Sequence, residues 1–267
     1  MKKTHPFLLC FDSDGTVMDT MGVKHERCFG PAFLDVFGID DPDGKILSHW
    51  LEVNLYRPTR GINRFQGLAE ILEFLATRGM VVPGYQDFVA WTKSTPRFSQ
   101  DLLALEAKKT NAPIFSLALS WSEEVNARIA SLPPSRPFPS AKRIIPTLAS
   151  ADLVGVSSAN AKAVLEEWGR VGLSPYFASI FAQEDGTKEQ ILRNALSLGY
   201  ERALMLGDAL GDYEAAKKAG IPFYPILPKK EDESWETFQK VAYPRFLAGE
   251  YDETPYVEAF IASLREP

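Results

Sequence analysis

A short apolar run near the start of the chain constrains its fold more than any other feature. Residues 7–11, Phe-Leu-Leu-Cys-Phe, end abruptly in the polar segment Asp-Ser-Asp-Gly-Thr at residues 12–16. A strand that is apolar on both faces is typical of a parallel sheet covered by helices. Similar runs recur at 153–156, 180–182 and 203–206, and helical patterns follow at 161–170, 188–198 and 212–219. This alternation predicts a doubly wound α/β sheet.

Residues 18–138 have a different pattern, with amphipathic helical spacing and no strand of comparable quality. The helical segments fall at 25–37, 48–56, 65–78, 87–93, 99–109 and 115–129. A proline-rich stretch at 131–139 is typical of a linker that returns to the sheet. We therefore expect an all-helical domain at 18–138, inserted into an α/β core made of 1–17 and 139–267. A short strand at 223–227 and helices at 234–247 and 254–264 complete the core.

Charge and cysteine content exclude several classes of function. The 267 residues contain 29 Lys and Arg against 35 Asp and Glu, so a net charge of −6 disfavours nucleic-acid binding. We see no apolar stretch near the roughly 18 residues that a membrane span needs. Two cysteines without metal-binding spacing are typical of a reducing compartment. We expect a cytoplasmic protein without nucleic-acid or membrane partners, and the oligomeric state stays open.

Polar residues follow the predicted strands at the edge where parallel strands present their carboxyl ends. Because ligands bind outside that edge, residues distant in sequence are expected to converge there. Several carboxylates in one cleft would repel each other unless a cation lies among them, and oxygen-only ligation suits Mg²⁺. The converging residues are Asp12, Asp14, Ser157, Lys188, Asp208 and Asp212.

The same edge has groups suited to an anion. Gly15 permits a sharp turn whose backbone N–H groups would face a phosphoryl group, with Ser157 and Lys188 nearby. If the first strand continues, Asp12 and Asp14 point the same way. Each residue also has a purely structural interpretation: the aspartates as turn or helix-capping residues, Ser157 as a helix cap with Ser158 in its place, Lys188 as a surface lysine, and Asp212 as a first-turn helix acid.

In their order along the chain, these motifs resemble those of the haloacid dehalogenase superfamily, in the branch with a helical cap between the first two motifs. The first motif is the segment at 12–16, the second is Ser157, the third is Lys188, and the fourth is Gly-Asp-Ala-Leu-Gly-Asp at 207–212. The resemblance covers both ends of the core and implies a Rossmann-like fold. Ser13 occupies a position that is often apolar in that family, and Pro146 interrupts the helix before the second motif.

The resemblance also implies roles for individual residues. Asp12 would be the nucleophile that forms an aspartyl-phosphate, and Asp14 would be the general acid and base. Mg²⁺ would be held by Asp12, by the backbone carbonyl of Asp14 and by Asp208, with Asp212 as a second-layer or water-mediated ligand. The phosphoryl group would contact Ser157, Lys188, Ser13 and Gly15.

An acid at position 14 indicates phosphate esters as substrates, because a poor leaving group needs a proton. The expected activity is a Mg²⁺-dependent phosphatase acting on a small phosphorylated metabolite. A phosphomutase would use the same residues, and a non-catalytic binding or regulatory protein on this scaffold is a more distant alternative.

Specificity is expected to come from the helical domain. Arg57, Arg60 and Arg64 have the spacing of one helical face, although Pro58 and Gly61 equally allow a loop. In either geometry their guanidinium groups could bind a carboxylate, a second phosphate or sugar hydroxyls. A solvated or salt-bridged basic face is the competing interpretation.

Overall fold

The computed structural model describes residues 2–95, 98–159 and 161–264, which form two compact units. One unit takes the chain up to Met21 and resumes at Pro134, and the other comprises Gly22–Pro133. The division lies a few residues inside the boundaries expected after residues 17 and 138. Backbone pairing explains the shift: Phe138 N donates to Val17 O at 3.0 Å, and Asp19 N donates to Arg136 O at 2.8 Å. The two connecting segments therefore belong to the first unit.

The first unit contains a five-stranded sheet in the order β3-β2-β1-β4-β5, with every pair parallel. The strands are β1 (Phe7–Phe11), β2 (Ala151–Val156), β3 (Ser179–Phe181), β4 (Arg202–Gly207) and β5 (Phe223–Pro225). The chain builds β2 and β3 on one side of β1 and then returns to build β4 on the other side. This order confirms the predicted doubly wound α/β fold and places the switch point beside β1.

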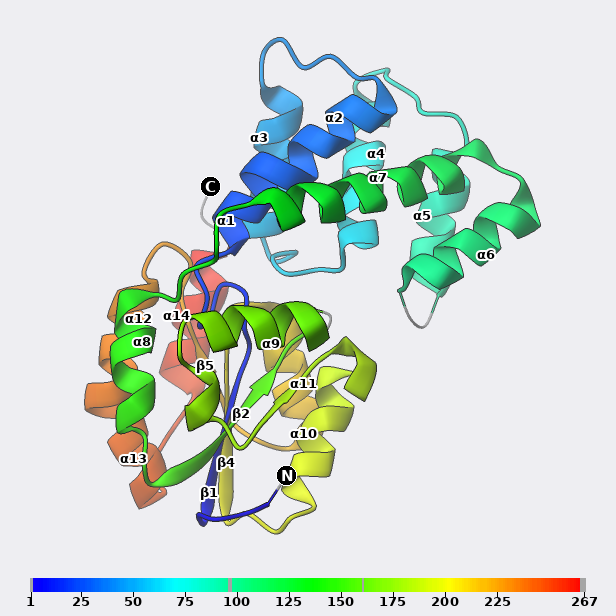
Figure 1. Ribbon diagram of the computed structural model, residues 1–267. Helices are drawn as coiled ribbons and strands as arrows, with labels where there is room; N and C mark the ends of the chain where they lie inside the picture. The colour runs from blue at the N-terminus through cyan, green and yellow to red at the C-terminus, as the bar shows by residue number, and fades with distance from the viewer. Residues whose placement is uncertain (1, 96–97, 160, 265–267) are drawn as a thin grey trace. The chain divides into compact units, whose positions relative to one another are not determined.

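Alternate residues of β1 pack into two different cores, which explains why its sequence is apolar throughout. Leu9 and Phe11 face one helical layer, and Leu8 and Cys10 face the other. The first layer comprises α8 (Pro139–Ile144), α9 (Ala161–Arg170), α12 (Glu231–Thr237) and α13 (Tyr243–Ala248). The second comprises α10 (Lys188–Leu196), α11 (Leu210–Ala219) and α14 (Thr254–Ser263). Figure 1 shows α8, α12 and α13 on one side of the strands and α10 and α11 on the other.

Short irregular helices complete this unit. Pro146 ends α8, and the chain continues as a 3₁₀ turn at Ile145–Thr147. Further 3₁₀ turns lie at Ser174–Tyr176 and Gln183–Asp185. The single helix expected at 234–247 is divided by a π-helical stretch, Phe238–Ala242, between α12 and α13.

The second unit contains helices joined by turns and no strand among its described residues, and it has its own core. Trp50 and Trp121 are fully buried in that core, as expected of packing residues. Figure 1 shows α7 as the long helix of this unit. Its helices are α1 (Met21–Lys24, which begins in the first unit), α2 (Gly30–Phe37), α3 (Lys45–Leu51), α4 (Arg64–Thr77), α5 (Tyr85–Ser94), α6 (Gln100–Thr110) and α7 (Pro113–Ser131), with π-helical stretches at His25–Phe29 and Glu52–Tyr56.

Cys10 and Cys28 are both buried and unpaired. In the described parts of the chain, no helix combines the length and the apolar character that crossing a bilayer requires.

Candidate active site

Three strand ends lie next to each other at the carboxyl edge of the sheet. The register pairs Phe11 of β1 with Gly155 of β2 on one side and with Leu206 of β4 on the other. Asp12 therefore leaves β1 level with Val156 and Gly207, one residue before Ser157 and Asp208 on the neighbouring strands. The Asp12 N–H extends the ladder by donating to Leu206 O at 3.0 Å.

Three buried carboxylates meet at this edge, and one lysine joins two of them. Oxygen atoms of Asp12, Asp208 and Asp212 all lie within 4.8 Å of one another, and the three residues are 7%, 1% and 1% exposed. The Nζ of Lys188, the first residue of α10, donates to Asp12 Oδ1 at 2.6 Å and to Asp212 Oδ1 at 2.5 Å. Asp14 is not a member of the carboxylate group.

Burial and mutual repulsion make this group electrostatically strained. Burial raises the pKa of Asp12 well above its usual value, the Lys188 ammonium opposes that shift, and the carboxylates of Asp212 and Asp208 add to it. For Lys188 burial disfavours the charged form, but the two carboxylates outweigh it and raise its pKa above the usual range. The group thus holds more negative charge than its one ammonium can balance, as expected of a site built to receive a cation.

The loop after β4 positions its two aspartates differently. Asp208 Oδ1 accepts a hydrogen bond from the Thr16 hydroxyl at 2.9 Å. Asp212, in the first turn of α11, accepts from the Ala209 N–H at 3.2 Å through Oδ2 while its Oδ1 accepts from Lys188. A Cβ on Gly207 would lie 2.4 Å from the Asp212 Cβ, so only glycine permits this approach.

The loop after β1 folds back on itself. The carbonyl of Ser13 accepts from the N–H groups of Val17 at 3.0 Å and Met18 at 2.9 Å. Gly15 takes a φ of +81°, which supplies the sharp turn expected of it. Its N–H donates to Met18 O at 2.9 Å and so helps to close the loop. The Ser13 hydroxyl accepts from Trp168 Nε1 at 2.8 Å, and its own proton can still donate to another group.

Asp14 stands apart from the buried carboxylates. The first strand ends at Phe11, so the alternation that would have aligned Asp14 with Asp12 does not continue through the turn. Asp14 is half-buried, and its Oδ1 accepts from the Thr20 hydroxyl at 2.6 Å. Its environment is therefore more open than that of Asp12, which suits exchange of a proton.

Ser157 is buried at the end of β2, and the neighbouring Ser158 is exposed. The Ser157 N–H donates to Phe181 O at 2.9 Å, and its Oγ accepts from the Ala159 N–H at 3.1 Å. The hydroxyl thus serves the local turn before α9 as an acceptor, and its proton can still donate to another group.

The three arginines of the helical unit do not share a helical face. Arg57 and Arg60 lie in the turn after the π-helical stretch, and α4 begins only at Arg64. Arg57 is exposed and pairs with Glu52 at 2.6 Å. Arg60 is buried and donates to Leu55 O at 2.8 Å. The loop interpretation of this segment is therefore the correct one.

Arg64 is surrounded by neutral groups. Its Nη1 donates to Asn126 Oδ1 at 2.8 Å and to Ser122 Oγ at 3.1 Å, and its guanidinium lies 5.2 Å from the centre of the Phe29 ring. Burial lowers the pKa of Arg64. Among the described residues, none of its hydrogen-bond partners is a carboxylate.

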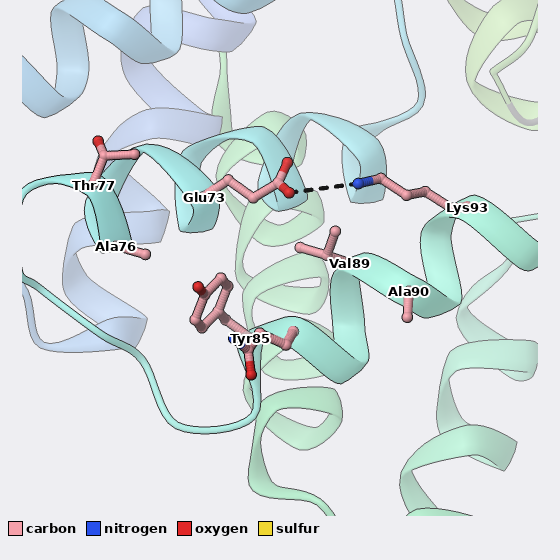
Figure 2. A pocket seen from close by; sticks show the side chains of 8 residues that line it. Glu73, Ala76, Thr77, Tyr85, Val89, Ala90 and Lys93 are labelled. Carbon is pink, nitrogen blue, oxygen red and sulfur yellow. Dashed lines mark hydrogen bonds and ion pairs between the residues drawn. The ribbon is translucent and has the colours of Figure 1, made fainter.

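An open hollow in the helical unit lies between α4 and α5 and has different chemistry. Figure 2 shows Glu73 of α4 and Lys93 of α5 facing each other across it, with Tyr85 beneath. These two charges pair at 3.5 Å, and none of the residues expected at the active site lines the hollow. It therefore does not compete with the carboxylate group as the site of chemistry.

Sequence reasoning did not assign roles to several residues that support the site. Thr16 lies within the first motif, so a functional interpretation of the whole motif could have found it. Thr20 carries no such signal, and neither do Trp168 and Trp235, whose contacts depend on tertiary packing alone.

A nucleophile candidate after a central strand, a lysine beside it and acidic residues after a neighbouring strand define a hydrolase-type site on a doubly wound sheet. The family model of the haloacid dehalogenase-like hydrolases matches residues 8–220, which is most of the chain. The protein belongs to this family and is a hydrolytic enzyme. No curated protein sequence gives a match to it.

Solved structures of the same family share the fold. A haloacid dehalogenase-like hydrolase from Streptococcus pneumoniae is 16% identical with a TM-score of 0.53, and the match covers 86% of this chain and 90% of that one. A predicted phosphoglycolate phosphatase from Haemophilus somnus is 14% identical with a TM-score of 0.53, covering 84% of this chain and 86% of that one. At these identities the likeness shows the fold alone.

Proposed function

We propose that this hydrolase is a Mg²⁺-dependent phosphatase that cleaves small phosphate monoesters through an aspartyl-phosphate. The observation that carries the proposal is the buried group in which Lys188 bridges Asp12 and Asp212 beside Asp208. A nucleophilic carboxylate must accept a phosphoryl group that carries negative charge of its own. An adjacent ammonium and a divalent cation together make that approach possible.

The donor set of the site fits Mg²⁺. Three carboxylates and one ammonium leave two net negative charges in a buried space, and all the donors are oxygen atoms, which this ion prefers. Asp12, Asp208 and the backbone carbonyl of Asp14 would hold it. Asp212 would act from the second layer, because both of its oxygens already accept hydrogen bonds. When bound, the ion would neutralise charge on the transferring phosphoryl group.

In the first step an Asp12 carboxylate oxygen attacks phosphorus. The bond between phosphorus and the ester oxygen breaks, and Asp14 in its protonated form gives its proton to the leaving alkoxide. The products of this step are an alcohol and an aspartyl-phosphate, and Asp14 is left as a carboxylate.

In the second step Asp14 takes a proton from water as the water oxygen attacks phosphorus. The bond to Asp12 breaks, and inorganic phosphate leaves with both residues restored. Throughout, Ser157 would donate its hydroxyl proton to a phosphoryl oxygen and Lys188 would balance its charge. The Ser13 hydroxyl accepts from Trp168 and keeps its own proton, so its hydroxyl and its backbone N–H are both proposed as donors to the phosphoryl group.

We propose that the helical unit, Gly22–Pro133, which lies within the range 18–138 expected from the sequence, acts as a cap that selects the leaving group. Within it, Arg64 is the strongest of the three arginine candidates, because Arg57 is already paired with an acid and Arg60 serves a backbone carbonyl. A half-buried guanidinium with neutral partners is costly unless an anion joins it. The preferred substrate would then carry a second anionic group, such as a carboxylate.

A comparison of two substrates tests the role of Arg64. Arg64→Ala is expected to lower kcat/KM for a phosphate ester with a carboxylate on its leaving group by roughly 10- to 150-fold, because one charge-assisted contact is lost. Hydrolysis of a small aryl phosphate should change little. Arg57→Ala is the matched control, because it removes an exposed, paired arginine. An equal loss on both substrates would remove Arg64 from the specificity site.

The proposed substrate is a small phosphorylated metabolite and the proposed compartment is the cytoplasm, where the two buried cysteines would stay reduced. The direct test measures release of inorganic phosphate from an aryl phosphate, with and without Mg²⁺ and with no sugar acceptor present. The proposal requires Mg²⁺-dependent release that Asp12→Asn abolishes. Phosphate release that needs neither Mg²⁺ nor the Asp12 carboxylate would refute it. If release requires both, a panel of phosphorylated metabolites would identify the substrate.

A further inference from the structure

Two fully buried tryptophans donate their indole N–H groups to the loop after β1. Trp168 of α9 donates to Ser13 Oγ at 2.8 Å, and Trp235 of α12 donates to the backbone carbonyl of Thr16 at 2.9 Å. Both side chains are 0% exposed. The two anchor points, Ser13 and Thr16, flank Asp14, and Asp12 directly precedes the first of them, so the motif is tied to the core on both sides of Asp14.

Aromatic packing fixes the direction of both N–H groups. The Trp235 ring stacks on Phe11, the last residue of β1, with ring centres 5.8 Å apart and planes within 4°. The Trp168 ring lies edge-on to Phe177 at 4.5 Å, and Phe177 lies edge-on to Phe11 at 5.6 Å. The base of the loop and its two donors thus form one aromatic cluster, in which neither indole can turn without disturbing its neighbours.

Each anchor point is adjacent to a group of the candidate site. Ser13 lies between Asp12 and Asp14, so holding its side chain fixes the peptide that joins them. Thr16 donates its hydroxyl to Asp208 Oδ1 at 2.9 Å, so holding its carbonyl also fixes a partner of that carboxylate. Trp235 lies beyond the residues 8–220 that the family model matches, so the loop depends on a segment outside the common core.

We infer that Trp168 and Trp235 are positioning residues that clamp the loop at residues 12–16 and so hold Asp12 and Asp14 in the geometry that the reaction needs. The catalytic consequence rests on the proposed function, whereas the clamp itself is a property of the fold. Because a misplacement of about 1 Å can lower a rate by roughly 100-fold, the clamp is expected to affect turnover more than substrate binding.

Hydrogen exchange measured by mass spectrometry tests the clamp without reference to activity. In full-length Trp168→Phe and Trp235→Phe, backbone amides of residues 15–18 should exchange roughly ten-fold faster than in the wild type, because the N–H groups of Gly15, Val17 and Met18 close the loop. Phenylalanine keeps most of the packing and removes the donor.

Tyr224→Phe is the matched control for Trp235→Phe. The Tyr224 hydroxyl is buried and donates to the backbone carbonyl of Ser234 at 2.7 Å, one residue before Trp235, without touching the loop. Its loss should weaken α12 to a similar degree and leave exchange in the loop unchanged. If both variants accelerate exchange in the loop equally, the effect belongs to helix stability and the clamp is refuted.

A double-mutant cycle tests the catalytic role of the Ser13–Trp168 bond. Ser13→Ala and Trp168→Phe should each lower kcat on an aryl phosphate by about ten-fold, with KM changed by less than about two-fold. The double variant should be no worse than the poorer single variant, since both changes remove the same bond. Multiplied losses would show that the two side chains act separately and would overturn the assignment.

A second experiment tests whether the Trp235 hydrogen bond affects Mg²⁺ binding through Thr16 and Asp208. Calorimetric titration of Trp235→Phe with Mg²⁺ alone should show affinity lowered by about ten-fold, because Thr16 no longer holds Asp208. Normal loop exchange refutes the clamp, and faster exchange with unchanged kcat and Mg²⁺ affinity refutes the positioning role. A wild-type protein that hydrolyses no phosphate ester refutes the proposed function instead, while the exchange data still decide whether the clamp exists.

Discussion

The two ends of the central sheet each bury negative charge, but in opposite ways. At the carboxyl end Asp12 lies among other carboxylates, and burial together with that repulsion raises its pKa. At the other end Asp152, the second residue of β2, is also buried. Burial alone would raise its pKa, but hydrogen bonds from Thr4, His5 and Tyr200 outweigh that effect and hold it well below the usual value.

The difference separates a structural carboxylate from a functional one. Asp152 has as many donors as it can use, so its charge stabilises the fold by tying the N-terminal segment and Tyr200 to β2. Asp12 lies in a group whose charges are unbalanced until a cation and a phosphoryl group arrive. Both carboxylates are buried, and the difference between them comes mainly from their neighbours: hydrogen-bond donors surround Asp152, whereas two other carboxylates lie beside Asp12.

The largest expected effect is that of Asp12→Asn on turnover. Loss of the covalent nucleophile should lower kcat by roughly 10⁴-fold or more, measured as phosphate release at saturating Mg²⁺. The unfolding free energy should not fall, because the Asp12 carboxylate, whose pKa is raised in the folded state, destabilises that state at neutral pH. Denaturant unfolding of metal-free protein should therefore give an unfolding free energy equal to or above that of the wild type.

Asp14→Asn should have the next largest effect, and the size should depend on the leaving group. Alkyl phosphates should lose roughly 10²- to 10⁴-fold in rate, because a poor leaving group needs a proton, and aryl phosphates should lose less in the first step. The second step also needs Asp14 as a base, so phosphorylated Asp12 should accumulate with aryl substrates. Rapid-quench mass spectrometry that finds no adduct, with equal losses on both substrates, would contradict the assignment.

Asp208 and Asp212 should contribute unequally to Mg²⁺ affinity. Asp208→Asn should weaken Mg²⁺ binding by about 100-fold and Asp212→Asn by about 10-fold, because both oxygens of Asp212 already accept hydrogen bonds from Lys188 and Ala209. Calorimetric titration measures both affinities, and Asp152→Asn serves as a control that removes a buried carboxylate from the opposite end of the sheet. Equal affinity in the Asp208 variant and the wild type would remove Asp208 from the site.

The smallest effect on activity should come from Asp152→Asn, with kcat within about two-fold of the wild type. The free energy of unfolding at pH 7 should fall by about 2 kcal/mol, because charged hydrogen bonds to buried donors are lost. A lowered pKa stabilises the fold above the unfolded carboxyl pKa of about 4, and that contribution disappears as the pH falls below it. The difference in unfolding free energy between the wild type and Asp152→Asn should therefore become smaller in acid. A difference that becomes larger there would contradict this account.

Much of the fold was predictable because it depends on local patterns. The apolar run at 7–11 had to be a strand buried on both faces, and the structure places it at the centre of the sheet. The segment 161–170 shows its helical period directly and forms α9 over the same residues. The helix expected at 234–247 was wrong in detail, because a π-helical stretch, Phe238–Ala242, divides it, and the apolar period does not indicate such a stretch.

The candidate residues at the strand ends could be named from the sequence because a parallel sheet brings its carboxyl ends to one edge whatever the chain does in between. Their environments could not be named. The Ser13 hydroxyl accepts from Trp168, 155 residues away, and Gly15 has the expected turn with its N–H directed to Met18. The helical spacing of three and four residues in Arg57, Arg60 and Arg64 gave no indication that the three guanidinium groups have different partners.

By itself the sequence determined the fold class, the family motifs and the types of group at the site, because strand periodicity, turn chemistry and motif order are written locally along the chain. Only the tertiary structure decided which carboxylates meet, which lysine balances them and which indole N–H groups hold the loop. Hydrogen bonds and charge interactions act over a few ångströms, and the partners that satisfy or strain a buried group come from elements far apart in the chain. Trp235 and Thr16, separated by 219 residues and joined at 2.9 Å, are one such pair.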